Sequence, residues 1–101
     1  MKSGIELIAI ERKRQIEELG YDYTNDVLYA NEQLAQAAAT YAMPKRIRDM
    51  YASYLTASDS WIPRWWPWSF KYWKPTQDDR IKELSKAGAL IAAQIDYLQN
   101  K

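Results

Sequence analysis

The feature that most constrains the fold is a stretch at residues 61–75, which holds all five tryptophans and three of the four prolines. A proline inside a helix removes a backbone donor and clashes with the preceding turn, so this stretch cannot be one continuous helix. It is also too aromatic to stay disordered, because burying such rings is strongly favourable. We therefore expect an ordered loop with one short turn of helix, and we call residues 61–75 the tryptophan loop.

Composition limits the classes of protein to which the chain can belong. Its 101 residues fit a single domain spanning 1–101, and 48% of them are hydrophobic, as in ordinary globular proteins. No apolar run is long enough to span a membrane, and no secretory signal is visible. Cysteine and histidine are both absent, which fits a reducing cytoplasm. We expect a cytoplasmic protein without a membrane partner.

Apolar residues recur every three or four positions in several segments, a spacing that predicts helices. The expected fold class is all-α: a compact bundle of three to four helices, closed by the tryptophan loop. The expected helices run over about 4–19, 25–42 and 44–55, and the last one begins near Thr76 with a stripe that reaches Leu98. The stripes expected to face the core are Ile5, Ile8, Ala9, Ile16 and Leu19 in the first helix, Ala30, Leu34, Ala37, Ala38 and Tyr41 in the second, Ile47, Met50, Tyr51 and Tyr54 in the third, and Ile81, Leu84, Gly88, Ile91, Ala92, Ile95 and Leu98 in the last.

Residues with special backbone properties mark the expected helix boundaries. Pro44 should stop the second helix and begin the third, and Thr76 with Asp79 resembles a capping box for the last. Gly88 lies inside a helical stripe at a cost of roughly 1 kcal/mol relative to alanine. We therefore expect a neighbour to approach closely there, such as a Trp ring. The other expected caps are Gly20 after the first helix and Thr24 or Asn25 before the second.

Cations alternate with rings in the tryptophan loop, where seven of the thirteen residues at 61–73 are aromatic. A ring can stack on a nucleotide base while Lys or Arg contacts its phosphates. The simpler interpretation is that the rings only close one end of the bundle. Both interpretations stay open at this point. The candidate ligand-binding residues are Arg12, Arg64, Trp65, Trp66, Trp68, Lys71, Trp73 and Lys74.

Arg12 is a candidate because it falls within the apolar stripe of the first expected helix. A buried guanidinium is costly unless it is paired. It could form a structural pair with Asp26, Asp78 or Asp79, or lie at the floor of an anion pocket. Its neighbours Glu11, Lys13 and Arg14 should point away from the core, into solvent. Lys45, Arg46 and Arg48 fall outside the apolar stripe of the third helix. Residues 43–75 carry six Lys or Arg against two Asp or Glu, so this part should face an anion.

The residue types present favour binding over catalysis. The chain lacks the usual near-neutral general base and the commonest metal ligand, because it has no histidine. It also lacks the Glu-x-x-Glu and Glu-x-x-Asp pairs that would place acids one helical turn apart around magnesium. We expect no catalytic residue, no metal ligand and no cofactor, so an enzyme is disfavoured. A net charge of +1 also disfavours tight binding to duplex nucleic acid.

Five blocks of sequence, taken in order, stand out along the chain. They are 8–16 (IAIERKRQI) with Gly20 and Tyr21, 34–42 (LAQAAATYA), Trp66-Pro67-Trp68, Trp73-Lys74-Pro75, and 86–93 (KAGALIAA). Together they resemble a family of small proteins encoded by bacteriophages and prophages. The resemblance implies a phage origin and a bacterial host cytoplasm, and it supplies no catalytic residues. Relatives often carry a His-Asp-Asp-type acidic cluster before the alanine-rich helix, where this chain keeps only Asp26.

Three functions are consistent with this sequence. The first is non-catalytic binding of a nucleotide-like anion, with sequestration of a host immune signal as the anti-defence role that a phage origin suggests. The second is a protein-interaction module, either a homo-oligomer or an inhibitor of a host protein, with the aromatic loop as its contact surface. The third is a degenerate MazG-like nucleotide pyrophosphohydrolase.

Overall fold

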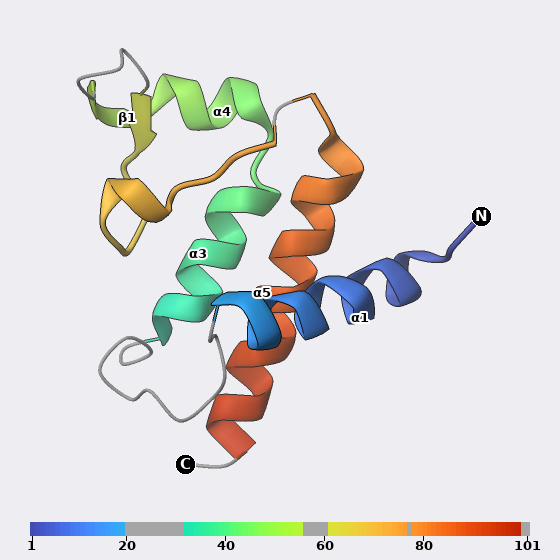
Figure 1. Cartoon of the computed structure of the whole chain (residues 1–101). Helices are drawn as coiled ribbons and strands as arrows, with labels where there is room; N and C mark the ends of the chain where they lie inside the picture. Colours follow the sequence, from blue (N-terminus) through green and yellow to red (C-terminus); the bar gives the residue numbers. More distant parts are fainter. Residues whose placement is uncertain (20–31, 56–60, 77, 100–101) are drawn as a thin grey trace.

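The structure, a computed structural model, describes residues 1–19, 32–55, 61–76 and 78–99. This part of the chain is mostly helical, which confirms the predicted all-α bundle with an aromatic-rich loop. In order, its elements are α1 (Gly4–Arg14), the π-helix η1 (Gln15–Leu19), α3 (Gln33–Ala42), α4 (Lys45–Met50), β1 (Ala52–Leu55), β2 (Trp61–Pro63), the 3-10 turn η3 (Phe70–Tyr72) and α5 (Arg80–Gln99) (Figure 1). The predictions for Gly20, Thr24, Asn25, Asp26, Ala30 and the side chains of Leu19 and Tyr54 lie outside what is described.

The core forms where α3 packs lengthwise against α5 (Figure 1). The predicted inner face of α3 is confirmed, because Leu34 and its neighbours on that face are buried. Alanines on both helices let the two backbones come close. The tryptophan loop closes one side of this core with Ile62 and Trp66. The buried partners are Leu34, Ala37, Ala38 and Tyr41 of α3 and Ala87, Leu90, Ala93 and Tyr97 of α5.

Side chains of α5 hold both ends of α3, where helical backbone groups lack partners within the helix. At the first turn, the Gln94 side-chain oxygen accepts a hydrogen bond from the backbone N–H of Ala35 at 3.1 Å. At the last turn, Arg80 donates to the carbonyl oxygen of Tyr41 at 2.8 Å and to that of Ala42. These contacts set α3 antiparallel to α5.

The face that α5 buries is not the one predicted from its apolar stripe. Ile81, Leu84, Ile91, Ile95 and Leu98 are exposed. The buried face mixes small apolar residues with polar ones that find partners elsewhere in the fold. Periodicity therefore identified the helix but assigned its apolar stripe to the wrong side. The buried residues of α5 are Glu83, Lys86, Ala87, Ala89, Leu90, Ala93, Gln94 and Tyr97.

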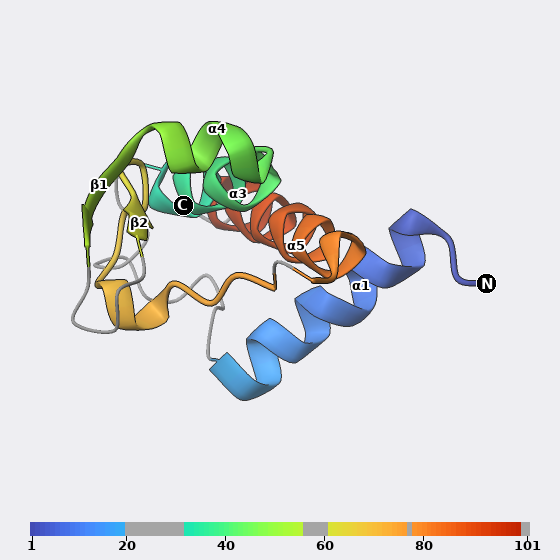
Figure 2. The same cartoon turned by 90° about the horizontal axis from the view of Figure 1, so that it is seen from above.

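The first helix, α1, crosses α5 rather than lying along it, and its amino-terminal half projects from the rest of the protein (Figures 1 and 2). The close approach predicted at Gly88 is confirmed, but the neighbour is Ile8: a β-carbon at position 88 would lie 2.5 Å from the Ile8 Cδ1 atom. The predicted stripe of α1 is wrong in part. Glu11 and Gln15 are buried, whereas Ile5, Ala9 and Ile16 are exposed.

The third predicted helix is shorter than expected. Pro44 does precede α4, as predicted, but that helix ends at Met50. The next residues form β1, which pairs antiparallel with β2 so that Leu55 lies opposite Trp61. Of the β1 residues, only Tyr54 is of a type enriched in strands, so pairing decides between strand and helix, and the partner strand begins six residues after Leu55.

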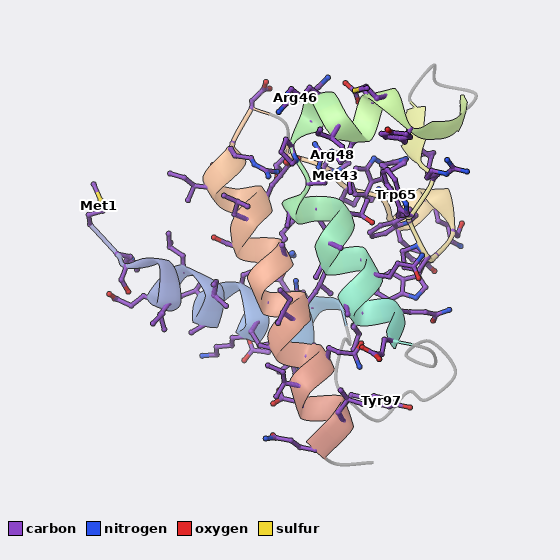
Figure 3. All side chains as sticks on the ribbon, turned by 180° about the vertical axis from the view of Figure 1, so that it is seen from behind. Met1, Met43, Arg46, Arg48, Trp65 and Tyr97 are labelled. Atoms are coloured by element: carbon purple, nitrogen blue, oxygen red, sulfur yellow. The ribbon has the colours of Figure 1, made fainter. Side chains whose placement is uncertain are left out.

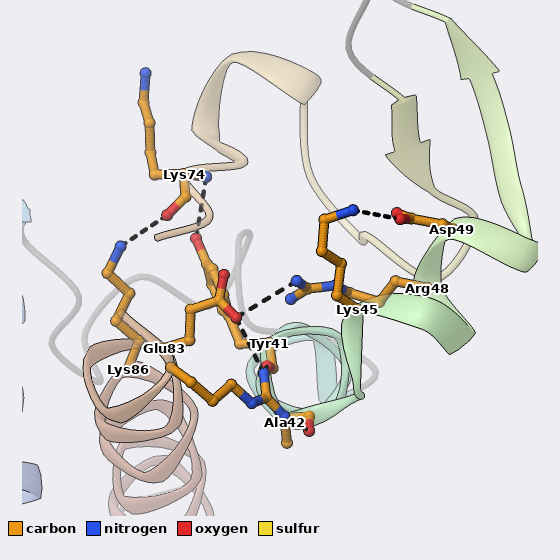
Figure 4. A network of polar contacts seen from close by, with 9 residues as sticks. Tyr41, Ala42, Lys45, Arg48, Asp49, Lys74, Glu83 and Lys86 are labelled. Carbon is orange, nitrogen blue, oxygen red and sulfur yellow. Dashed lines mark hydrogen bonds and ion pairs between the residues drawn. The ribbon is translucent and has the colours of Figure 1, made fainter. Parts of the chain in front are cut away.

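A buried cluster of charges joins α4 to α5. The Glu83 carboxylate, 1% exposed, lies 3.0 Å from Arg80 and 3.4 Å from Arg48, which is also buried (Figures 3 and 4). The Arg48 guanidinium faces the Trp73 ring at 5.3 Å from its centroid. Arg48 was predicted to fall outside the core-facing stripe, but it is buried. The stripe could not show this, because the acid that pairs with Arg48 lies 35 positions along the chain.

We predict that Glu83→Ala destabilises the fold by about 3–5 kcal/mol, because it leaves Arg48 buried without its counter-ion. The measurement is urea unfolding followed by circular dichroism. Asp49→Ala is the control, since it breaks an exposed pair with Lys45 and should cost less than about 1 kcal/mol. Equal losses in the two variants would contradict a structural role for Glu83.

Candidate ligand-binding cleft

A cleft of about 440 Å³ opens between the α1–η1 helix, the tryptophan loop and α5. Rings from α3 and the loop line one part of it, and charged side chains line the remainder. We call this cavity the cleft. Its lining comprises the rings of Tyr41, Trp66, Trp68 and Tyr72, the cations Arg14, Lys74, Lys82 and Lys86, the acids Glu11 and Glu18, and also Gln15 and Leu90.

The rings of the cleft are held in fixed positions. Trp66 packs edge-on against Tyr41 and Trp68, with centroid separations of 5.5 and 5.4 Å. The Trp66 indole N–H donates to the carbonyl oxygen of Ser69 at 3.0 Å, and that of Trp68 donates to the side-chain oxygen of Gln33 at 3.2 Å. Because both indole donors are satisfied, the ring faces are set by packing and hydrogen bonding together.

The backbone at Lys74 is held from two sides (Figure 4). Its N–H donates to the Tyr41 hydroxyl at 3.1 Å, and its carbonyl oxygen accepts a hydrogen bond from the Lys86 ammonium at 2.7 Å. The Lys74 side chain itself is exposed. The loop therefore presents this cation at the edge of the cleft from an anchored peptide unit.

Lys86 lies within the cleft in a partly apolar environment. Burial lowers the pKa of Lys86 below its ordinary value, because removal from water disfavours the charged form, and the attraction of Glu11 opposes this only in part. Its ammonium also lies over the Tyr41 ring, 5.5 Å from the centroid.

The two acids of the cleft are both bound to Arg14. Its guanidinium donates to the Glu11 carboxylate at 2.9 and 2.6 Å and to that of Glu18 at 3.3 Å. The hydrogen bond to Glu11 is the main reason that the pKa of Arg14 is raised. Contrary to the prediction, Glu11 and Arg14 therefore face the protein rather than solvent. Four cations against two carboxylates leave the cleft with a surplus of positive charge.

Three of the eight predicted ligand-binding residues, Trp66, Trp68 and Lys74, line the cleft. Trp73 lies behind its wall, stacked on Tyr41 at a centroid separation of 4.8 Å. The other four lie elsewhere. Arg12 pairs with Asp96 at 3.4 Å, an acid that was not considered from sequence. Trp65 packs on Tyr51 (Figure 3), and Arg64 and Lys71 are exposed outside the cleft.

Sequence reasoning missed most of the cations of the cleft. It expected the anion-facing charge at 43–75, but only Lys74 comes from that part of the chain. One signal was present: Lys82 and Lys86 are four residues apart, so they lie on the same side of α5. The position of Arg14 depends on how α1 crosses α5, which local patterns do not encode.

The last predicted helix, α5, does not begin with the capping box of Thr76 and Asp79 that the sequence suggested. The Asp79 carboxylate accepts a hydrogen bond from the Lys82 N–H at 3.1 Å, so Asp79 caps α5. The Thr76 hydroxyl has no hydrogen-bond partner among the described residues. The start of α5 near the cleft is therefore set by Asp79.

Comparisons of the chain with protein-family models, curated proteins and solved structures found no match. Over the described ranges, no group of three or more His, Cys, Asp or Glu is placed to hold a metal ion. In the same part of the chain, no helix has the length and hydrophobicity needed to cross a membrane.

We predict that the lowered pKa of Lys86 makes the free energy of unfolding increase as the pH is raised toward 10.5. Between that pKa and the ordinary value of 10.5, the unfolded state binds more protons than the folded state, so the free energy of unfolding rises with pH. Lys86→Met should lack this rise. The measurement is urea unfolding at several pH values below 10.5. Exposed Lys82→Met is the control, and an identical pH dependence in wild type and Lys86→Met would contradict the prediction.

Proposed function

We propose that the protein binds a small aromatic anion of the nucleotide type in the cleft, without catalysing a reaction on it. The observation that carries this proposal is the meeting of ring faces and surplus cations in one cavity. Rings alone would suit many apolar ligands, and lysines alone would suit any anion. Their combination favours a ligand with both a planar base and a phosphate.

The dimensions and exposure of the cleft support this assignment. Its volume of about 440 Å³ lies within the range of roughly 300–1,000 Å³ typical of small-molecule sites. Tyr72 is exposed and Trp68 is half-buried, so their rings are accessible for stacking. Lys74 and Lys82 are both exposed at the cleft and can turn toward a phosphate without breaking a buried contact.

The ion pairs formed by both acids of the cleft support ligand binding over hydrolysis. A pyrophosphohydrolase would need carboxylates free to hold magnesium, whereas Glu11 and Glu18 both bind Arg14. This disfavours the degenerate MazG-like alternative. In a phage protein, non-catalytic binding of a nucleotide would suit sequestration of a nucleotide-derived immune signal in the host cytoplasm.

A different surface supports the alternative of a protein partner. Met50 and Tyr51 are exposed at the end of α4, and the Trp65 ring lies 5.4 Å from that of Tyr51. Exposed aromatic side chains of this kind are common at protein interfaces. An inhibitor of a host protein would use this patch, which does not share lining residues with the cleft.

We predict that a nucleotide will bind with a change in Trp fluorescence and that Lys74→Ala and Lys82→Ala will each weaken it roughly tenfold, through loss of a charged contact. Tyr72→Ala should weaken it similarly, through loss of stacking. The measurement is calorimetric titration with nucleoside mono-, di- and triphosphates and cyclic dinucleotides.

Arg64→Ala is the matched control, because it removes an exposed cation of the tryptophan loop that does not line the cleft. It should bind as wild type does. If this control weakens binding as much as the cleft variants, nonspecific attraction would explain the binding. If no nucleotide binds, the patch at Met50, Tyr51 and Trp65 becomes the better candidate.

A further inference from the structure

The exposed apolar stripe of α5 is a second surface that suits a binding partner. Five large aliphatic side chains on this helix are each 46–66% exposed. They recur at steps of three, seven, four and three residues, so they lie on one side of the helix, as in a helix that packs against another helix. The exposed residues are Ile81, Leu84, Ile91, Ile95 and Leu98.

The first helix, α1, extends this apolar surface. Ile5 and Ile10 are 82% and 52% exposed. Leu7 and Ile10 of α1 line a shallow hollow together with Ile81 of α5, and charged residues line the rest of it: Glu11, Asp79 and Lys82. Among the described elements, α1 packs on α5, so the outer side of α1 is uncovered over its projecting half (Figures 1 and 2).

We infer that a second copy of this chain covers the surface formed by α1 and α5. A two-fold dimer requires a patch that is complementary to itself. The α5 stripe meets that requirement, because a row of aliphatic side chains can pack against an identical row from a second copy. It is also free of charge, so two such stripes can meet without burying an unpaired ion.

The area available is sufficient for a specific dimer. α5 has 20 residues and α1 has 11. At 1.5 Å per residue and roughly 10 Å in width, the two helices present on the order of 500 Å² per copy. Two copies together then bury about 1,000 Å², at which specific interfaces begin. A dimer of moderate affinity, with Kd in the micromolar range, is expected from such an interface.

This inference does not rest on the proposed nucleotide site. None of the five exposed α5 side chains lines the cleft, so variants of the stripe leave its lining unchanged. Loss of dimerisation and loss of ligand binding can therefore be measured separately.

The test is sedimentation equilibrium of the wild type and of the Ile91→Glu/Ile95→Glu variant from about 1 to 300 µM. We expect a reversible wild-type dimer, weakened at least roughly a hundredfold in the variant because two interface anchors become charged. Met50→Glu is the matched control, since it places the same charge on an exposed aliphatic position outside α1 and α5, and it should dimerise as wild type does. Circular dichroism establishes that each variant is folded.

A second measurement uses the absence of cysteine from the chain. Ile91 lies near the middle of the stripe, so Ile91→Cys should cross-link two copies through a short bismaleimide in either helix direction, whereas Met50→Cys should not. A wild type that stays monomeric at 300 µM would overturn the inference. So would equal cross-linking of the two cysteine variants.

Discussion

The rest of the structure depends on one buried carboxylate, that of Glu83. It forms ion pairs with Arg48 of α4 and with Arg80 of its own helix. Arg80 also donates hydrogen bonds to the last carbonyl groups of α3. Arg48 in turn faces Trp73, which stacks on Tyr41. Three helices and the tryptophan loop therefore meet around a single acid. Because charges are costly to bury, this arrangement sets positions more than it adds stability.

Local sequence predicted the parts of the fold that depend on local physics. The inner face of α3 could be predicted because Leu34, Ala37, Ala38 and Tyr41 satisfy the helical period with no polar residue among them. The ordered tryptophan loop followed from the conformational limits of proline and the burial of large rings. The tight contact at Gly88 followed from the cost of glycine within a helix.

The parts that failed depend on partners distant in the chain. Glu83 and Lys86 look like solvent-facing residues until Arg48 and the Lys74 carbonyl are placed beside them. β1 likewise needs β2 before a strand is preferred to helix. The same limit applies to the cleft: its rings could be named from sequence in part, but its cations come from α1, the loop and α5 and meet only after folding.

The anchored backbone of Lys74 has a consequence for the thermodynamics of the ligand binding that we propose. A loop that orders only when a ligand arrives must lose backbone entropy at that moment, and this loss reduces the affinity. Here the Tyr41 hydroxyl and the Lys86 ammonium hold the N–H and the carbonyl oxygen of Lys74 in the folded protein. The backbone entropy at Lys74 is lost during folding instead, so a ligand of the proposed kind would have to order only the side chain of Lys74 there.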